Sequence, residues 1–304
     1  MIILIFLAIF KLLFLAFPEV VLAASRAGLL LWFNNVMPAL LPFIIITNLL
    51  MNLGFAELLG KFLAPFMHKI FNLPGKCSIA LIAGLTSGYP IGAKTVHELR
   101  KNSSISKQNA QHLLAFCNNA GPLFILGVVG IGFFDSKPIG YLLWVGHIMA
   151  ALVIGILLKN KKKSDYQEIN ISIIVTNGFS KALGSSIKNA MESMAVIGGV
   201  IIFFNTILAI FGEIGFPDKG LFAGLLAGLI EITGGLNKIA ESGTNVTSLA
   251  IAAFVIAFGG FSIHMQTFMF TEGAGIKAMP YLLAKFLHGI IAAIFTILLS
   301  IFFI

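Results

Sequence analysis

The sequence predicts an all-α, polytopic helical membrane protein with two inverted-topology repeats, each containing a re-entrant helical hairpin and a broken transmembrane helix. Three observations support this fold class. The 304-residue chain is 58% hydrophobic and 11% charged, which is more apolar surface than one water-soluble core can bury. Several apolar runs approach the roughly 20 residues that a helix needs to cross a bilayer. Short related sequences also recur in the same order in both halves.

The apolar segments expected to cross the membrane are 2–17, 36–55, 111–134, 139–158, 195–212, 249–270 and 281–304. No basic segment precedes the first one, so residues 1–18 are predicted to be an uncleaved N-terminal transmembrane helix rather than a signal peptide. Two further segments, 77–99 and 220–242, are interrupted by glycine-rich sequence. We expect each to form a re-entrant hairpin, because bare backbone at this depth is tolerated only inside protein or along a cavity.

The internal repeat is visible in short matches. Leu-Ile-Ala-Gly-Leu at 81–85 is similar to Leu-Leu-Ala-Gly-Leu at 225–229. The predicted domains are a first repeat at 19–158, with hairpin 77–99 and broken helix 111–134, and a second at 178–304, with hairpin 220–242 and broken helix 249–270. A hairpin does not change sides, so each repeat crosses the membrane three times. This odd number inverts the second repeat, as in many secondary transporters.

Charge supports the same topology. Most of the 20 Lys and Arg residues fall on one side of the predicted arrangement, and this side is the cytoplasm by the positive-inside rule. The linker at 159–177, which opens with Lys-Asn-Lys-Lys-Lys, is therefore predicted to be cytoplasmic. The net charge of +8 is explained by such loops, and no nucleic-acid partner is expected. The expected location is the cell membrane, with several crossings.

The sequence shows no pattern of an enzyme. Cys77 and Cys117 have no metal-ligand spacing, and Ile-Gly-Ala-Lys at 91–94 lacks the spacing of a phosphate-binding P-loop. We find no catalytic triad and no cluster of metal ligands. We therefore predict no catalytic residue, no bound metal and no enzymatic activity.

Glu231 is the acidic residue that stands in the middle of an apolar membrane segment. An ionisable group there costs roughly 3 kcal/mol or more, so a functional role is the default hypothesis. A coupling proton or Na⁺ could bind near it, and no other cofactor is expected. His147 and His288 lie in apolar helices as well, where we expect helix–helix hydrogen bonds.

Four interruptions of apolar segments carry clustered polar side chains. Broken helices expose N–H groups that suit anions and carbonyl groups that suit cations. We expect one central site for a small-molecule substrate rather than four unrelated sites. Its predicted binding residues are Ser87, Gly88, Tyr89, Lys94, Asn118, Asn119, Glu231, Thr233, Ser262, His264 and Gln266.

The motifs at these interruptions are similar to the signatures of a known family. They are Ser-Gly-Tyr-Pro-Ile-Gly-Ala-Lys at 87–94, Phe-Cys-Asn-Asn-Ala-Gly-Pro-Leu-Phe-Ile at 116–125, Gly-Leu-Ile-Glu-Ile-Thr at 228–233 and Gly-Gly-Phe-Ser-Ile-His-Met-Gln at 259–266. They resemble the sporulation integral membrane protein YlbJ family. This family belongs to a wider group with a nucleoside-recognition, or gate, domain, whose fold is related to that of concentrative nucleoside transporters.

The resemblance implies a secondary transporter in a mother-cell-derived membrane around the forespore, with dipicolinic acid, a small anionic aromatic metabolite, as its cargo. It also implies substrate contacts at the hairpin tips and broken helices. Two alternatives stay open: a transporter of a nucleoside or another small neutral metabolite, and a non-transporting membrane scaffold in spore formation. The lipid bilayer is the other expected partner. The sequence is compatible with a homo-oligomer but does not indicate one.

Overall fold

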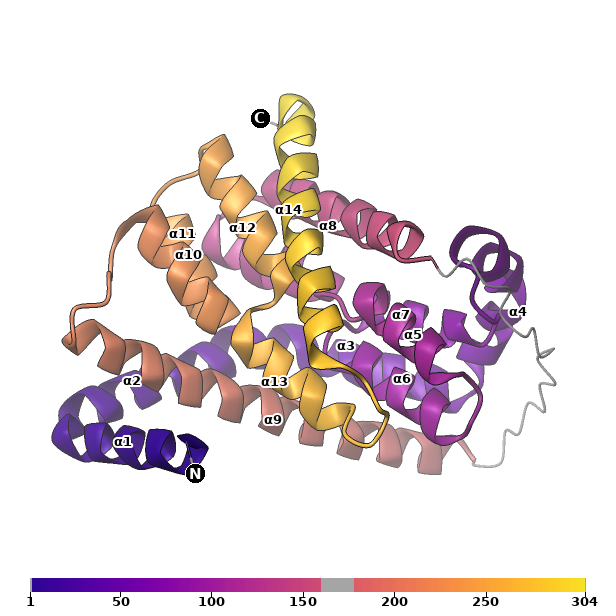
Figure 1. Ribbon diagram of the computed structural model, residues 1–304, viewed down its shortest axis with the longest axis horizontal. Helices are drawn as coiled ribbons and strands as arrows, with labels where there is room; N and C mark the ends of the chain where they lie inside the picture. Colours follow the sequence, from indigo (N-terminus) through magenta and orange to yellow (C-terminus); the bar gives the residue numbers. More distant parts are fainter. Residues whose placement is uncertain (1, 160–177, 304) are drawn as a thin grey trace.

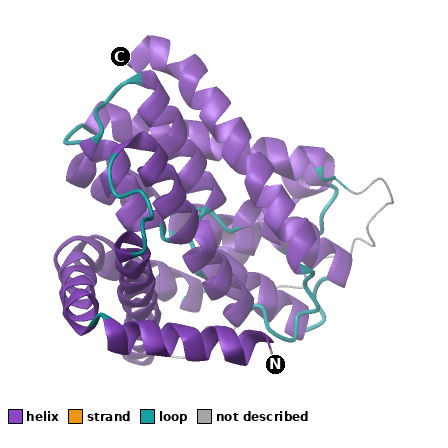
Figure 2. Cartoon of the chain, turned by 60° about the vertical axis from the view of Figure 1, so that its left-hand side comes forward, coloured by secondary structure: helices purple, strands orange, loops and turns teal. Residues whose placement is uncertain are grey.

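The computed structural model describes residues 2–159 and 178–303, and this part of the chain contains helices but no strand. Five helical segments are long and apolar enough to cross a membrane: Pro18–Asn52, Lys137–Leu157, Phe179–Glu213, Val246–Phe270 and Ala278–Phe302. The predicted all-α membrane fold is therefore confirmed. Figure 2 shows that short loops join the helices.

The first half of the chain contains α1 (Ile2–Ala16), α2 (Pro18–Leu31), η1 (Trp32–Val36), α3 (Met37–Asn52), α4 (Phe55–Phe66), η2 (Met67–Phe71), α5 (Cys77–Thr86), α6 (Ile91–Lys101), α7 (Lys107–Cys117), η3 (Phe124–Phe133) and α8 (Lys137–Leu157). The second half contains α9 (Phe179–Glu213), α10 (Gly220–Ile230), α11 (Ile232–Glu241), α12 (Val246–Phe258), α13 (Gly260–Phe270) and α14 (Ala278–Phe303).

The N-terminal region differs from the expected boundaries. The span expected at 36–55 is part of one helical run from Pro18 to Asn52, in which the π-helical turn η1 precedes Pro38 near the start of α3. A wider turn accommodates a proline because proline cannot donate the next helical hydrogen bond. Helix α1 has 15 residues, so the N-terminal crossing at 1–18 stays a prediction.

Each glycine-interrupted segment forms two short helices joined at a break. In the first, α5 and α6 are separated by residues 87–90, and in the second, α10 and α11 meet at Glu231. The segments expected to be broken helices are likewise divided, into α7 and η3 and into α12 and α13. Their grouping into two inverted repeats stays a prediction, and residues 160–177 of the basic linker lie outside the described residues.

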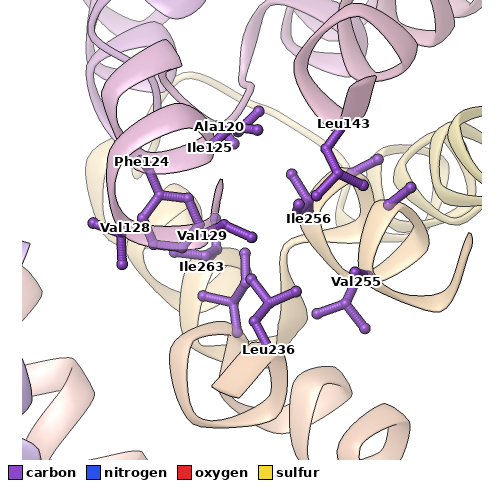
Figure 3. Packing of buried hydrophobic residues seen from close by; sticks show 14 of the residues in the cluster. Ala120, Phe124, Ile125, Val128, Val129, Leu143, Leu236, Val255, Ile256 and Ile263 are labelled. Carbon is purple, nitrogen blue, oxygen red and sulfur yellow. The ribbon is translucent and has the colours of Figure 1, made fainter. Parts of the chain in front are cut away.

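The helix pairs are arranged around a shared core. Helices α2 and α3 pack along α9, and α14 packs against α8 and α12 (Figure 1). Buried side chains from η3, α8, α11, α12 and α13 form this core. Figure 3 shows several of them, including Phe124, Val129, Leu143, Leu236, Ile256 and Ile263. This packing places the breaks of different helices close to one another.

Two glycines allow the half-helices to approach closely. A Cβ atom on Gly84 of α5 would overlap the carbonyl oxygen of Cys117 at the end of α7, and one on Gly235 of α11 would overlap the backbone of Gly228 in α10. Both contacts are backbone to backbone, so no side chain can move aside to relieve the overlap.

We expect Gly84→Ala and Gly235→Ala to lower stability by roughly 1–3 kcal/mol, the usual cost of overpacking a closely packed interior. The measurement is thermal unfolding of the purified protein in detergent. Gly199→Ala in α9 is the control, because a Cβ there meets no atom within 4 Å and alanine favours a helix. Equal Tm values for all three variants would contradict the close-packing argument.

Candidate functional site

A buried cavity lies where the breaks of the two helix pairs meet. Its walls come from Ser87 and Tyr89 beyond α5, from Glu231 to Thr233 at the start of α11, and from α13. The full lining is Val36, Leu40, Ser87, Tyr89, Gly121, Phe124, Ile197, Val200, Ile201, Glu231, Ile232, Thr233, Ser262, Ile263 and Gln266. The space open to the centre of a water molecule is about 30 Å³, which is room for water but not for a metabolite.

Glu231 joins α10 to α11 with an extended backbone. Its side chain is 1% exposed, and its two carboxylate oxygens accept hydrogen bonds from the N–H groups of Thr233 (3.0 Å) and Gly234 (2.6 Å). These N–H groups form the free N-terminal end of α11, where the helix dipole favours a negative charge. Glu231 is therefore both the cap of α11 and an acidic group at the cavity.

The tip of the first helix pair is fixed by the break between α7 and η3. The Tyr89 N–H donates to the carbonyl oxygen of Asn119 at 2.6 Å. Gly88 has a φ of +78°, and a Cβ at this position would overlap the backbone of Gly121. Glycine therefore serves here to bring Ser87 and Tyr89 to the cavity, and Gly88 itself does not line it.

Several side chains in the cavity wall have buried polar atoms without a hydrogen-bond partner. These atoms are the hydroxyl oxygens of Ser87, Tyr89 and Ser262 and the amide oxygen of Gln266. A buried polar atom left unpaired costs about 1–3 kcal/mol, so these four atoms are available for hydrogen bonds to water or to a polar group inside the cavity. The structure thus brings together Ser87, Tyr89, Glu231, Thr233, Ser262 and Gln266.

The other predicted binding residues do not line this cavity. The Asn118 amide donates to Thr267 (2.8 Å) and Tyr281 (2.9 Å), and the Asn119 amide donates to the Phe116 carbonyl (2.7 Å). His264 packs edge-on against the rings of Phe258 and Tyr281. Lys94 is part of α6 and is half-buried outside the cavity wall.

Residues of α9 were missing from the predicted site. Ile197, Val200 and Ile201 form an apolar wall of the cavity, but in the sequence they belong to an unbroken apolar run that resembles any other crossing helix. Lys285 was also left without a role, although an ionisable residue inside an apolar segment is a signal that could have indicated one.

Comparisons with known proteins show the family of the chain. The family model described as "Gate: Nucleoside recognition" matches residues 33–118. The "Sporulation integral membrane protein YlbJ" of Bacillus subtilis (strain 168) is 30% identical to this chain, over 93% of the chain and 78% of that protein. The chain belongs to the YlbJ family. The resemblance seen in the sequence motifs is thereby confirmed, and the chain is a multi-pass membrane protein. No solved structure matches it.

The nucleoside-recognition match lies within the first half of this YlbJ-family chain. It runs from η1 to the residue after α7 and so includes Ser87 and Tyr89, but it ends at Asn118, at the first residue of the α7–η3 break. Glu231, Ser262 and Gln266 lie outside the matched segment. The polar wall of the cavity is therefore completed by the second half of the chain.

We expect Glu231→Ala to destabilise this YlbJ-family protein by about 1–2 kcal/mol, because the N–H groups of Thr233 and Gly234 at the start of α11 lose their acceptor. Glu231→Gln keeps one carbonyl acceptor, so its Tm should fall between those of wild type and Glu231→Ala. Thermal unfolding of purified protein checks this order. Glu192→Ala, at an exposed position on α9, is the control, and a Glu231→Ala Tm equal to that of wild type would refute the capping role.

Proposed function

We propose that this YlbJ-family protein is a secondary transporter that carries a small polar metabolite through the cavity between the two helix breaks. The observation that carries the proposal is the set of unpartnered polar atoms of Ser87, Tyr89, Ser262 and Gln266 beside Glu231, in an otherwise apolar protein interior. A scaffold would have no use for such a costly group of unpaired atoms.

The size of the cavity favours a mechanism in which the site opens and closes. Ligand pockets usually have volumes of roughly 300–1,000 Å³, far above the space at this cavity. Because Tyr89 and Glu231 belong to separate helix pairs, movement of one pair against the other would enlarge the cavity between them. Alternating access by relative movement of two halves around a central site is the usual mechanism of such transporters.

The first candidate for the cargo is dipicolinic acid, moved into the forespore during sporulation. The name of the Bacillus subtilis relative supports a role in sporulation. The cavity wall is poorly suited to an anion by itself, because it contains the Glu231 carboxylate and no Lys, Arg or His. A dianion would be repelled unless a proton or Na⁺ at Glu231 compensates the charge.

The second candidate is a nucleoside or a similar neutral compound, and two observations favour it. The nucleoside-recognition model matches the segment that holds the first helix break. The Glu231 carboxylate and the Gln266 amide oxygen are acceptors, which suit the N–H and O–H donors of a base and a sugar. Lys94, the residue expected to attract an anion, lies outside the wall.

Uptake into proteoliposomes tests the site and its cargo together. We expect Tyr89→Phe and Ser262→Ala each to reduce uptake by roughly tenfold, since each removes one polar contact to the cargo. The Tm should not fall, because neither hydroxyl has a partner in the protein. Tyr141→Phe and Ser300→Ala, which lie outside the cavity, are matched controls. Uptake of labelled dipicolinate is compared with uptake of labelled nucleoside. If the protein takes up neither compound, a transport role for these cargoes is refuted.

Glu231→Gln tests the coupling ion. If a proton or Na⁺ neutralises Glu231, uptake by wild type should rise with an imposed gradient of that ion, and Glu231→Gln should lose this dependence because its amide carries no charge. The measurement compares initial uptake rates with and without each gradient. Lys94→Ala provides a second test, of whether Lys94 attracts an anion from outside the wall. Uptake by Glu231→Gln that still responds to the gradient would contradict coupling at this residue.

A further inference from the structure

A second buried polar group lies at the contact between α8 and α14, outside the cavity wall. Lys285 is 2% exposed, and His147 and His288 are 1% and 0% exposed. The Lys285 Nζ lies 2.8 Å from Nδ1 of His288, and Nε2 of His288 lies 3.1 Å from the carbonyl oxygen of His147. These three residues, called the basic cluster below, form one chain of hydrogen bonds.

The contacts of the basic cluster assign its protons. A charged lysine can only donate, so Nδ1 of His288 is an acceptor and its Nε2–H donates to His147. Nε2 of His147 accepts from the Ala120 N–H at 3.2 Å, so its own proton is on Nδ1. With Lys285 charged, both imidazoles are neutral, and the ammonium group of Lys285 holds the single positive charge of the cluster.

The charge of Lys285 has no carboxylate partner among the described residues. The titratable groups that face it are His147 from α8, His264 from α13, Cys117 from α7, and His288 from its own helix. Helix α12 (Val246–Phe258) has no titratable residue. The Nζ of Lys285 donates to the carbonyl oxygen of Asn118 at 3.0 Å, which carries a partial negative charge at the C-terminal end of α7, where the helix dipole favours a cation.

The break between α7 and η3 connects the basic cluster to the cavity. Lys285 binds the carbonyl of Asn118, and His147 binds the N–H of Ala120. Between these two residues, the carbonyl of Asn119 accepts the hydrogen bond from Tyr89, which lines the cavity. Asn118 and Ala120 are thus hydrogen-bonded to the basic cluster, and Asn119 between them is hydrogen-bonded to Tyr89 of the cavity wall.

We propose that Lys285, His288 and His147 form a proton-binding site. While Lys285 holds its proton, this site fixes the backbone of the α7–η3 break in the position seen in the structure. When the proton leaves Nζ for water, Lys285 becomes a neutral amine that keeps two N–H bonds. Asn118 then loses its charged donor, and the end of α7 loses its countercharge. The break loosens, and Tyr89 is held less firmly. This inference does not depend on the proposed transport or on the identity of a cargo.

Hydrogen–deuterium exchange of the Tyr89 and Ala120 amides tests the proposal on the full-length protein in lipid nanodiscs. Protection is compared with the exchange expected for an unfolded chain from about pH 6 to about pH 11, a range that brackets the ordinary pKa values of His and Lys. In wild type we expect protection of both amides to fall by roughly tenfold as Lys285 releases its proton. Lys285→Met should show low protection at every pH. Lys285→Arg, which keeps its charge, should stay protected throughout.

Lys137→Met at an exposed position should match wild type. The amide of Glu231, which bonds to Ala227 within the second helix pair, reports whether each variant is folded. If Lys285→Met also loses protection at the Glu231 amide, that variant is misfolded. The pH dependence of wild type is then compared with that of Lys285→Arg alone to test the proposal. Protection that does not change with pH in wild type, or that changes equally in Lys285→Arg, would overturn the proposal.

Discussion

The structure depends on the pairing of buried charges with the ends of broken helices. Glu231 is held by the free N–H groups that begin α11, and Lys285 is held by a carbonyl at the end of α7. In a continuous helix these backbone groups would bond to each other and would not be available. The breaks are thus what allows two opposite charges to remain inside apolar helices without forming an ion pair with each other.

The breaks in turn require close contact between backbones. A break exposes polar groups that need protein around them, and side chains would keep neighbouring half-helices apart. Gly84, Gly88 and Gly235 remove this obstacle, because each lies where a Cβ would overlap another backbone. Gly84 and Gly88 hold the first helix pair against Cys117 and Gly121, and Gly235 holds α11 against α10. Dense packing within each half thus fixes the two breaks that line the cavity.

The sequence predicted well what depends on local composition. The all-helical membrane fold followed from hydropathy, and Glu231 was conspicuous as a charge in an apolar segment. The sequence could not predict the direction in which a side chain points from a short helix, which depends on where that helix begins. Lys94 was expected beside the site, but α6 begins at Ile91 and directs it outside the cavity wall. Lys285 also stands in an apolar segment, but the sequence could not show what it binds, because its backbone partner Asn118 lies 167 residues away.

Tyr89 links the two charged regions. Its side chain lines the same cavity as Glu231, and its N–H is bonded to the break that Lys285 and His147 hold. A movement that opens the cavity at Tyr89 therefore displaces Asn119, which accepts the Tyr89 hydrogen bond. The residues on either side of Asn119 are hydrogen-bonded to the basic cluster. Breaking one hydrogen bond to a charged group costs about 1.5–3 kcal/mol, which is enough to change the ratio of closed to open states by roughly tenfold or more. Occupancy of the cavity and the proton on Lys285 would then bias the same movement, although they act on different residues.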